Sequence, residues 1–343
     1  MITGRETATP SPYYKERGMN KTMISILKVL DAQYDKITGS REIARRLTAH
    51  GIELAERTVR YHLRILDEKG YTRVLGKEGR RITQKGREEL SQSLVSEKVG
   101  FVITKIETLS YLSDFDIETK KGKIILNVTF FPEDQFAPAL KAMKGAFSSV
   151  FNMSDRVITA RSGESIGDVP VPAGHVGFGT VCSVTINSIL LKAGVPVTSR
   201  FGGVLQVQDG EPSRFLALIS YDGSSLDPLE IFIRSSMTDV RSAVTHNSGK
   251  ILASFREIPA VCVGRAGELK MKMQEKGLGG ILAIGSPNRP LLEMPVGTDK
   301  AGIVVVGGLN PIAAVEEEGI VTKSRAMSTL CEYSKLVRFS EVS

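Results

Sequence analysis

Apolar residues recur with the period of an α-helix in three short segments near the start of the chain. The segments are Lys21–Gln33, Ser40–Leu47 and Ala55–Gly70. Gly51 and Gly70 stand where the second and third helices are expected to end. The third segment has no capping serine near Ala55, so we expect a frayed helix start there. On each segment one face collects the apolar side chains, which are Ile24, Leu27, Leu30, Ile43, Ala44, Leu47, Val59, Leu63 and Leu66.

Two short strand-like segments follow, Tyr71–Leu75 and Arg80–Thr83, joined by the tight turn Gly76–Gly79. Three helices and a hairpin in this order predict a winged helix-turn-helix domain over residues 20–96. In such a domain a helix enters the major groove and the hairpin lies along phosphates. The alternative for the third helix is an ordinary amphipathic helix with solvated charges. Residues 1–19 are polar and are predicted to form a disordered tail.

The net charge is concentrated in this first part of the chain. Residues 1–96 contain 19 lysines and arginines against 12 acidic residues, whereas residues 97–343 contain 26 of each. The whole formal excess of +7 therefore lies in the predicted winged helix. Such a localised excess favours a nucleic-acid partner for this domain, and we expect double-stranded DNA. The predicted DNA-contacting residues are Arg41, Arg57, Thr58, Arg60, Tyr61, Arg64, Lys77, Arg80 and Arg81.

Strand-like and helix-like patterns alternate from Gly100 onward. The segment Lys123–Phe131 reads as a strand and Pro132–Met153 as a helix, and Ser162–Gly179 is rich in glycine and proline. Hairpin-like strand pairs favour an α+β fold of two-layer plait-like units over a doubly wound sheet. We predict one regulatory domain over residues 97–343, with a subdivision near residue 260. No strong internal repeat is visible in the sequence.

Later in the chain we expect a helix over Ser183–Ala193, a helix from Asp227 to Val244 and a short acidic helix over Pro311–Gly319. The helix pattern also covers Arg87–Lys98, between the two predicted domains, and Gly267–Lys276. The remaining segments that read as strands are Val195–Val207, Ser213–Tyr221, Lys250–Arg256, Gly280–Gly285, Leu291–Val296, Ala301–Gly307 and Tyr333–Phe339.

The composition narrows the functional class. Cys182, Cys262 and Cys331 form no metal-binding or disulfide pattern, which indicates a reducing, cytoplasmic location. The N-terminus resembles no signal peptide, and no apolar run is long enough to span a bilayer, so no membrane partner is expected. His175 and His246 are isolated, and the sequence lacks the common nucleotide-binding and hydrolase motifs. We therefore expect no enzyme activity, no metal and no cofactor.

One passage is suited to bind an anion. Glycine-rich backbone leads into the predicted helix Ser183–Ala193, and the N–H groups at a helix N-terminus attract carboxylates and phosphates. The next strand begins with Arg200, whose planar guanidinium suits a carboxylate. The alternative is a structural arginine paired with Asp222 or Glu230. The candidate site residues are Gly177, Gly179, Thr180, Cys182, Ser183, Thr198, Ser199, Arg200 and Gly202.

Cys182 stands at this helix start, where the pKa of a thiol can be lowered. A redox sensor, a ligand contact and a small buried side chain are all open readings.

Several long strings identify a family resemblance. Together with the winged-helix pattern they resemble the NrpR family of archaeal nitrogen regulatory repressors: GTVCSVTINSILLKAGVPVTSRFGG (179–203), ISYDGSSLDPLEIFI (219–233), GKILASFREIP (249–259) and AGIVVVGGLNPIAAVEEEGI (301–320). The resemblance implies a repressor of nitrogen-fixation and nitrogen-assimilation genes that 2-oxoglutarate releases from its operator. Because one winged helix reads only a few base pairs, we expect a homodimer or a hetero-oligomer with another regulatory-domain protein. A 2-oxoglutarate dianion suits the anion site inferred above.

A different class remains open, namely a nuclease or RNA-processing factor that holds its substrate with the winged helix. Such a hydrolase needs clustered carboxylates for a metal ion. The only dense acidic run is Glu316–Glu318, and neighbouring residues on a helix point apart, so it makes a poor metal site.

Overall fold

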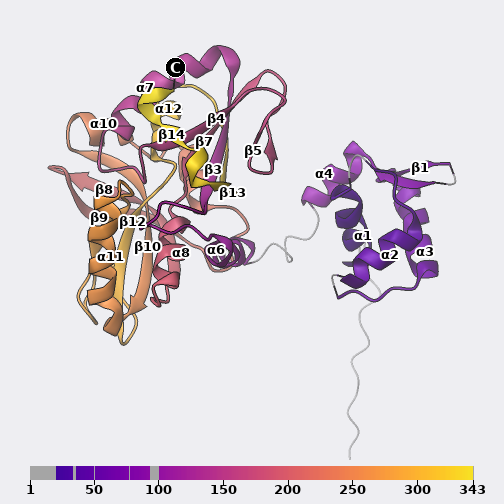
Figure 1. The fold of residues 1–343 in the computed structure, drawn as a ribbon, viewed down its shortest axis with the longest axis horizontal. Coiled ribbons are helices and arrows are strands. Elements are labelled where there is room, and N and C mark those ends of the chain that lie inside the picture. The colour runs from indigo at the N-terminus through magenta and orange to yellow at the C-terminus, as the bar shows by residue number, and fades with distance from the viewer. Residues whose placement is uncertain (1–20, 34–35, 50, 77, 93–99, 343) are drawn as a thin grey trace, which may run out of the picture. The chain divides into compact units, whose positions relative to one another are not determined.

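A computed structural model describes residues 21–33, 36–49, 51–76, 78–92 and 100–342. The chain divides into two compact units, Met1–Ser96 and Glu97–Ser343. Figure 1 shows the first unit in indigo and the second from magenta to yellow. The expected tail over residues 1–19 lies outside the described residues, as does the later part of the expected helix over residues 87–98.

The first unit is a winged helix-turn-helix, as predicted. Its elements in chain order are α1 (Lys21–Asp31), α2 (Ser40–Ala49), α3 (Glu56–Glu68), β1 (Thr72–Leu75), β2 (Gly79–Ile82) and α4 (Gln84–Gln92). The strands form an antiparallel hairpin. The predicted apolar faces pack together into a separate core, in which Val59, Leu63 and Leu66 of α3 are fully buried. No side chain caps α3 at Ala55, in agreement with the sequence.

The second unit contains two five-stranded sheets whose strand pairs are all antiparallel. This pairing confirms the α+β class. The first sheet has the order β13 (Lys323–Glu332), β3 (Lys123–Pro132), β7 (His175–Val181), β4 (Arg156–Ala160) and β14 (Val337–Arg338). The second has the order β11 (Ile281–Ile284), β12 (Lys300–Val306), β10 (Gly249–Pro259), β8 (Thr198–Gln208) and β9 (Glu211–Ser220).

Helices cover these sheets, and α7 and α12 lie side by side in Figure 1. β3 is buried at every residue from Ile124 to Phe131, so its sequence, in which only Asn127 and Thr129 are polar, lacks the alternation of a half-exposed strand. The helices and remaining short elements are α6 (Phe101–Leu112), η1 (Glu133–Gln135), α7 (Phe136–Phe147), β5 (Ser165–Ile166), β6 (Val169–Pro170), α8 (Val184–Lys192), α9 (Pro228–Arg234), α10 (Val240–Thr245), η2 (Ala260–Cys262), α11 (Val263–Glu275), α12 (Asn310–Glu316), η3 (Tyr333–Lys335) and η4 (Phe339–Glu341).

The second unit is an internal duplication that the sequence did not reveal. Strand, 3-10 turn and helix follow one another in β3–η1–α7 and again in β10–η2–α11. Strand, helix and strand then repeat in β7–α8–β8 and β12–α12–β13. The last strand of each half is exchanged, because β8 pairs with β10 of the second half and β13 pairs with β3 of the first. We call these parts the first and second halves of the regulatory unit.

Strand exchange explains why the expected subdivision near residue 260 does not match the sheets. β10 ends at Pro259, yet it pairs with β8 before that boundary and with β12 after it. A division there would split the second sheet.

Three secondary-structure predictions were wrong. The single helix expected from Asp227 to Val244 is divided into two helices, α9 and α10. The segment Leu291–Val296 forms only an isolated bridge between Leu291 and Met294. Of the last expected strand, Tyr333–Phe339, only the two-residue strand β14 is formed, and 3-10 turns occupy most of the rest. The pattern analysis also missed α6, β4 and β13. In the described part of the chain no helix combines the length and the apolarity that crossing a bilayer requires.

Candidate functional site

A basic face on α3 is the first candidate site. Arg57, Arg60, Tyr61 and Arg64 are exposed there, while Thr58 is half-buried. Two of the arginines are held by acids on the same helix, since Arg60 Nη2 lies 2.6 Å from Glu56 Oε1 and Arg64 Nε 3.9 Å from Glu68. Exposed ion pairs of this kind are weak and exchange readily for phosphate or base contacts. The helix therefore presents three arginines and one aromatic ring to a partner.

The hairpin contributes less than the sequence suggested. Arg80 is only 22% exposed, and its Nε donates to Asp67 Oδ2 at 2.7 Å. Its backbone also pairs with Thr38, so Arg80 clamps the hairpin to the helices and is not presented to a partner. Arg81 is half-buried, and Lys77 lies outside the described residues. Arg41 is 90% exposed and lies 3.7 Å from Glu56, and Arg73 on β1 is an exposed cation that the sequence analysis did not select.

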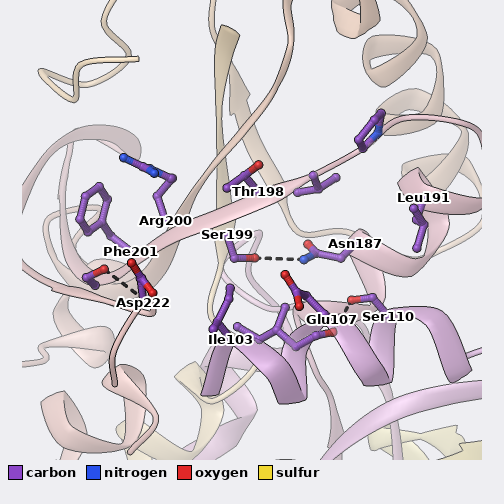
Figure 2. A pocket seen from close by; sticks show the side chains of 14 residues that line it. Ile103, Glu107, Ser110, Asn187, Leu191, Thr198, Ser199, Arg200, Phe201 and Asp222 are labelled. Carbon is purple, nitrogen blue, oxygen red and sulfur yellow. Dashed lines mark hydrogen bonds between the residues drawn. The ribbon is translucent and has the colours of Figure 1, made fainter. Parts of the chain in front are cut away.

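The second candidate site is a pocket of about 470 Å³ in the regulatory unit, between α6, α8 and β8. Figure 2 shows Glu107 and Ser110 rising from α6 on one side and Thr198, Ser199 and Arg200 along β8 on the other. Asn187 and Leu191 of α8 and Asp222 after β9 complete the wall. This volume lies in the range of small-molecule sites, which is about 300–1,000 Å³.

Three of the nine predicted anion-site residues line this pocket, namely Thr198, Ser199 and Arg200. Gly177, Gly179 and Thr180 do not, because they are buried within β7 and its backbone groups belong to the sheet. Gly202 is also buried, where a side chain would collide with Pro228 of α9. The expectation of free N–H groups facing outward from residues 177–183 was therefore wrong.

Arg200 sits at the rim of the pocket, with half of its side chain exposed. Its Nε lies 3.5 Å from Glu257 Oε2, so the structural partner is Glu257 and not Asp222 or Glu230, as the alternative had assumed. Glu257 also accepts the N–H of Gly297. This second donor holds Glu257 in place, whereas Arg200 has donors left for a ligand.

Arg256 lies behind the pocket wall, and sequence analysis missed it. Its side chain is 2% exposed, and burial lowers its pKa to about 10, which still leaves it charged at neutral pH. Within the described structure its hydrogen-bond partners are neutral oxygens, namely the Ser183 carbonyl, the Asn187 amide and the Ser254 hydroxyl. A buried charge held only by neutral groups is costly and points to function. An arginine within the strand-like segment Ile251–Ile258 was the available sequence signal.

Asn187 connects this buried charge to the pocket. Its Oδ1 accepts from Arg256 Nη1, and its Nδ2 donates to Ser199 Oγ at 3.0 Å. Ser199 and Arg256 are also direct partners in the ladder between β8 and β10. The positive charge therefore lies one side chain away from the space that a ligand would occupy.

Cys182 and Ser183 line a separate void of about 20 Å³, together with Tyr221 and Asp227. This void is the size of one water molecule rather than of a metabolite. Burial raises the pKa of the Cys182 thiol to about 11, opposite to the lowering expected at a helix N-terminus. Cys182 is thus an inert buried side chain, and the redox and ligand readings are not supported.

Asp227 is the unusual group of this void. Its carboxylate caps α9 by accepting from the N–H of Leu229 at 2.8 Å. Burial, together with the nearby Glu230, raises its pKa from 3.8 to about 7. Between these values the folded protein holds a proton that the unfolded chain has released. Stability is therefore lost as the pH rises through this window.

We expect Asp227→Asn to become increasingly more stable than the wild type as the pH rises from 5 to 8. Asparagine also caps helices but carries no charge to bury, so its advantage should grow by about 2–3 kcal/mol across this range. Urea unfolding at several pH values measures the difference. The exposed Asp134→Asn is the matched control, which should follow the wild type. A difference between Asp227→Asn and the wild type that stays constant with pH would contradict the assignment.

Comparisons with known proteins agree with this architecture. A family model described as NrpR regulatory domains NRD1 and 2 matches residues 99–338. A model described as Ribonuclease R winged-helix domain matches residues 24–90, which is the winged-helix unit alone. The structure is similar to the crystal structure of a nitrogen repressor-like protein from Methanococcus jannaschii, with a TM-score of 0.59 and 28% sequence identity. The match covers 69% of this chain and 98% of that protein's chain.

Curated relatives extend over both units. The Global nitrogen regulator NrpRI of Methanosarcina mazei is 38% identical over 93% of this chain and 98% of its own length. The Global nitrogen regulators NrpR of Methanococcus maripaludis and Methanocaldococcus jannaschii are 31% and 30% identical over 91% and 94% of this chain. In those two cases the match spans 54% and 55% of the relative. The chain belongs to the NrpR family of nitrogen regulators.

Proposed function

We propose that this protein is a DNA-binding repressor of nitrogen-fixation and nitrogen-assimilation genes that 2-oxoglutarate releases from its operator. The relatives named as global nitrogen regulators support the regulatory role. The winged helix with its basic α3 supports duplex DNA as the partner. A repressor of this kind needs no catalytic group and no bound cofactor, and its effector is a freely exchanging metabolite.

The observation that carries the effector proposal is the pocket between α6, α8 and β8. It has room for a small organic acid, a guanidinium at its rim and a second, uncompensated guanidinium behind its wall. Arg200 offers its remaining donors to one carboxylate of 2-oxoglutarate. The inner end of the ligand lies toward Ser199 and Asn187, where Arg256 favours negative charge.

Two acidic side chains also line the pocket, Glu107 and Asp222. Their negative charges lower the affinity for an anion, so that a bound anion can dissociate again. Glu107 belongs to α6, the first helix after the residues that connect the two units. A ligand that changes the position of α6 therefore acts on the helix from which the chain connects back to the winged helix.

Release requires that the effector bind the DNA-free state more tightly than the DNA-bound state. A typical coupling changes affinity by about 5- to 150-fold. We further propose that two chains, or this chain and another regulatory-domain protein, present two winged helices to a palindromic operator, because one such domain reads only a few base pairs. Binding of 2-oxoglutarate then changes the spacing of the two recognition helices.

The test is a gel shift on a promoter fragment of a nitrogen-fixation operon, with and without 2-oxoglutarate. The wild type should leave the DNA as 2-oxoglutarate is added. Arg200→Ala should bind DNA normally and stay bound, because the rim cation is gone. Glu107→Gln should be released at a lower concentration, because repulsion of the anion is removed.

Two results would contradict the proposal. If the wild type ignores 2-oxoglutarate, the effector is a different compound. If Arg200→Ala is released at the wild-type concentration, the site lies elsewhere and Arg200 serves only to pair with Glu257. A duplex RNA of the same sequence serves as the control for the nuclease and RNA-processing alternative, and preferential binding or cleavage of it would favour that class.

A further inference from the structure

The duplication places a second copy of the pocket wall at a known position in the second half. The turns after α8 and α12 match bond for bond, since Gly194 N donates to Leu191 O at 3.0 Å and Gly319 N to Glu316 O at 2.9 Å. Both glycines are left-handed, with φ of 79° and 81°. Leu191 therefore corresponds to Glu316, and the first residues of the strands that follow align up to Ser199 and Ser324.

The strand ladders confirm this correspondence independently. Ser199 of β8 pairs with Arg256 of β10, and Ser324 of β13 pairs with Thr129 of β3. Ser199 thus corresponds to Ser324, and Arg256 to Thr129. By the same alignment Val197 corresponds to Thr322.

In the second half the carboxylate of Glu316 lies at the position that corresponds to the pocket of the first half. Glu316 Oε1 accepts from Thr322 Oγ1 at 2.6 Å, and Thr322 Oγ1 lies 3.2 Å from Ser324 Oγ. Ser324 Oγ in turn lies 3.0 Å from Thr129 Oγ1. The hydroxyl groups are thus linked to a carboxylate of the protein itself, so this half contains its own acid where the first half has an open pocket.

The first half has the opposite balance of charge. Leu191 stands in place of the carboxylate of Glu316, Val197 in place of a hydroxyl group, and Arg256 in place of the neutral Thr129. Relative to the second half, this half has lost one negative charge and gained one buried positive charge. Leu191, Val197 and Ser199 all line the open pocket.

We propose that a carboxylate of the bound effector occupies, in the first half, the position that the Glu316 carboxylate occupies in the second. Ser199 and Asn187 then donate to it, and Arg256 supplies the compensating charge from behind. Leu191 and Val197 act as specificity residues, because their short apolar side chains leave this position free for an acid from solution. The inference rests on the proposed function, in which this pocket binds 2-oxoglutarate.

The test rebuilds the second half's own arrangement in the first half of the full-length chain. Leu191→Glu combined with Val197→Thr copies the pair Glu316 and Thr322. Leu191 is 44% exposed, so the change does not disturb the core. The internal carboxylate should then take the effector's place, and isothermal titration calorimetry should show 2-oxoglutarate binding weakened by about tenfold or more.

The matched control is Leu191→Gln with Val197→Thr, which has the same shape without the charge and should bind 2-oxoglutarate more tightly than the glutamate variant. Circular dichroism and a thermal melt check that both variants fold. If the wild type binds 2-oxoglutarate and the glutamate variant binds it equally well, this inference is overturned while the proposed function stands. Equal loss in both variants also overturns it, since shape rather than charge is then decisive. If the wild type itself does not bind 2-oxoglutarate, the proposed function fails.

Discussion

Raising the salt concentration from 50 to 200 mM is expected to weaken operator binding by about a thousandfold or more, if six or more phosphates are contacted. Each phosphate neutralised by lysine or arginine releases condensed counterions, so affinity falls steeply as salt rises. The formal charge excess of +7 lies entirely within residues 1–96, and α3 presents Arg57, Arg60 and Arg64 on one exposed face. Fluorescence anisotropy with labelled operator DNA at a series of salt concentrations gives the slope.

Binding of 2-oxoglutarate without DNA, measured by isothermal titration calorimetry over the same salt series, is the control, because a single small ligand releases few ions and its affinity should depend weakly on salt. An operator affinity that is flat with salt would contradict the assignment of the basic face. It would also leave the charge excess of the first unit without a role.

Replacing Arg57 and Arg64 together by alanine is expected to lower operator affinity by about 30-fold or more. Each well-placed arginine contact to a base contributes about 1–3 kcal/mol, and contacts two helical turns apart add approximately. The loss should be largest on the operator and smaller on random DNA, because base contacts carry the sequence preference. Competition gel shifts with operator and random duplexes measure both affinities.

Two arginine variants serve as matched controls. Arg73→Ala removes an exposed cation of the hairpin and should weaken operator and random DNA alike, as expected for a phosphate contact. Arg265→Ala removes an arginine of α11 that lies 2.8 Å from Glu268, and it should change neither affinity. Equal losses on operator and random DNA for the α3 variant would show that α3 does not read bases.

The sequence by itself determined the winged-helix unit and its charge. Helical contacts are local, so the spacing of Val59, Leu63 and Leu66 already defines the buried face of α3. Net charge is a property of composition and needs no fold, and the long strings shared with the NrpR family place the regulatory domain. Arg200 was selected from its type and its glycine-rich surroundings, and it lines the pocket, while its binding of an effector stays a prediction.

Only the tertiary structure decided which residues surround the pocket. Strand partners are not encoded by the two-residue period, so the exchange of β8 and β13 between the halves, and with it the duplication, stayed hidden. The same pairing buries Gly177 and Gly179 inside a sheet and brings Arg256 within hydrogen-bonding distance of Asn187. These two side chains are 69 positions apart in the chain. The charge of Arg256 acts on the pocket because β8 and β10 pair there, and no local sequence pattern predicts that pairing.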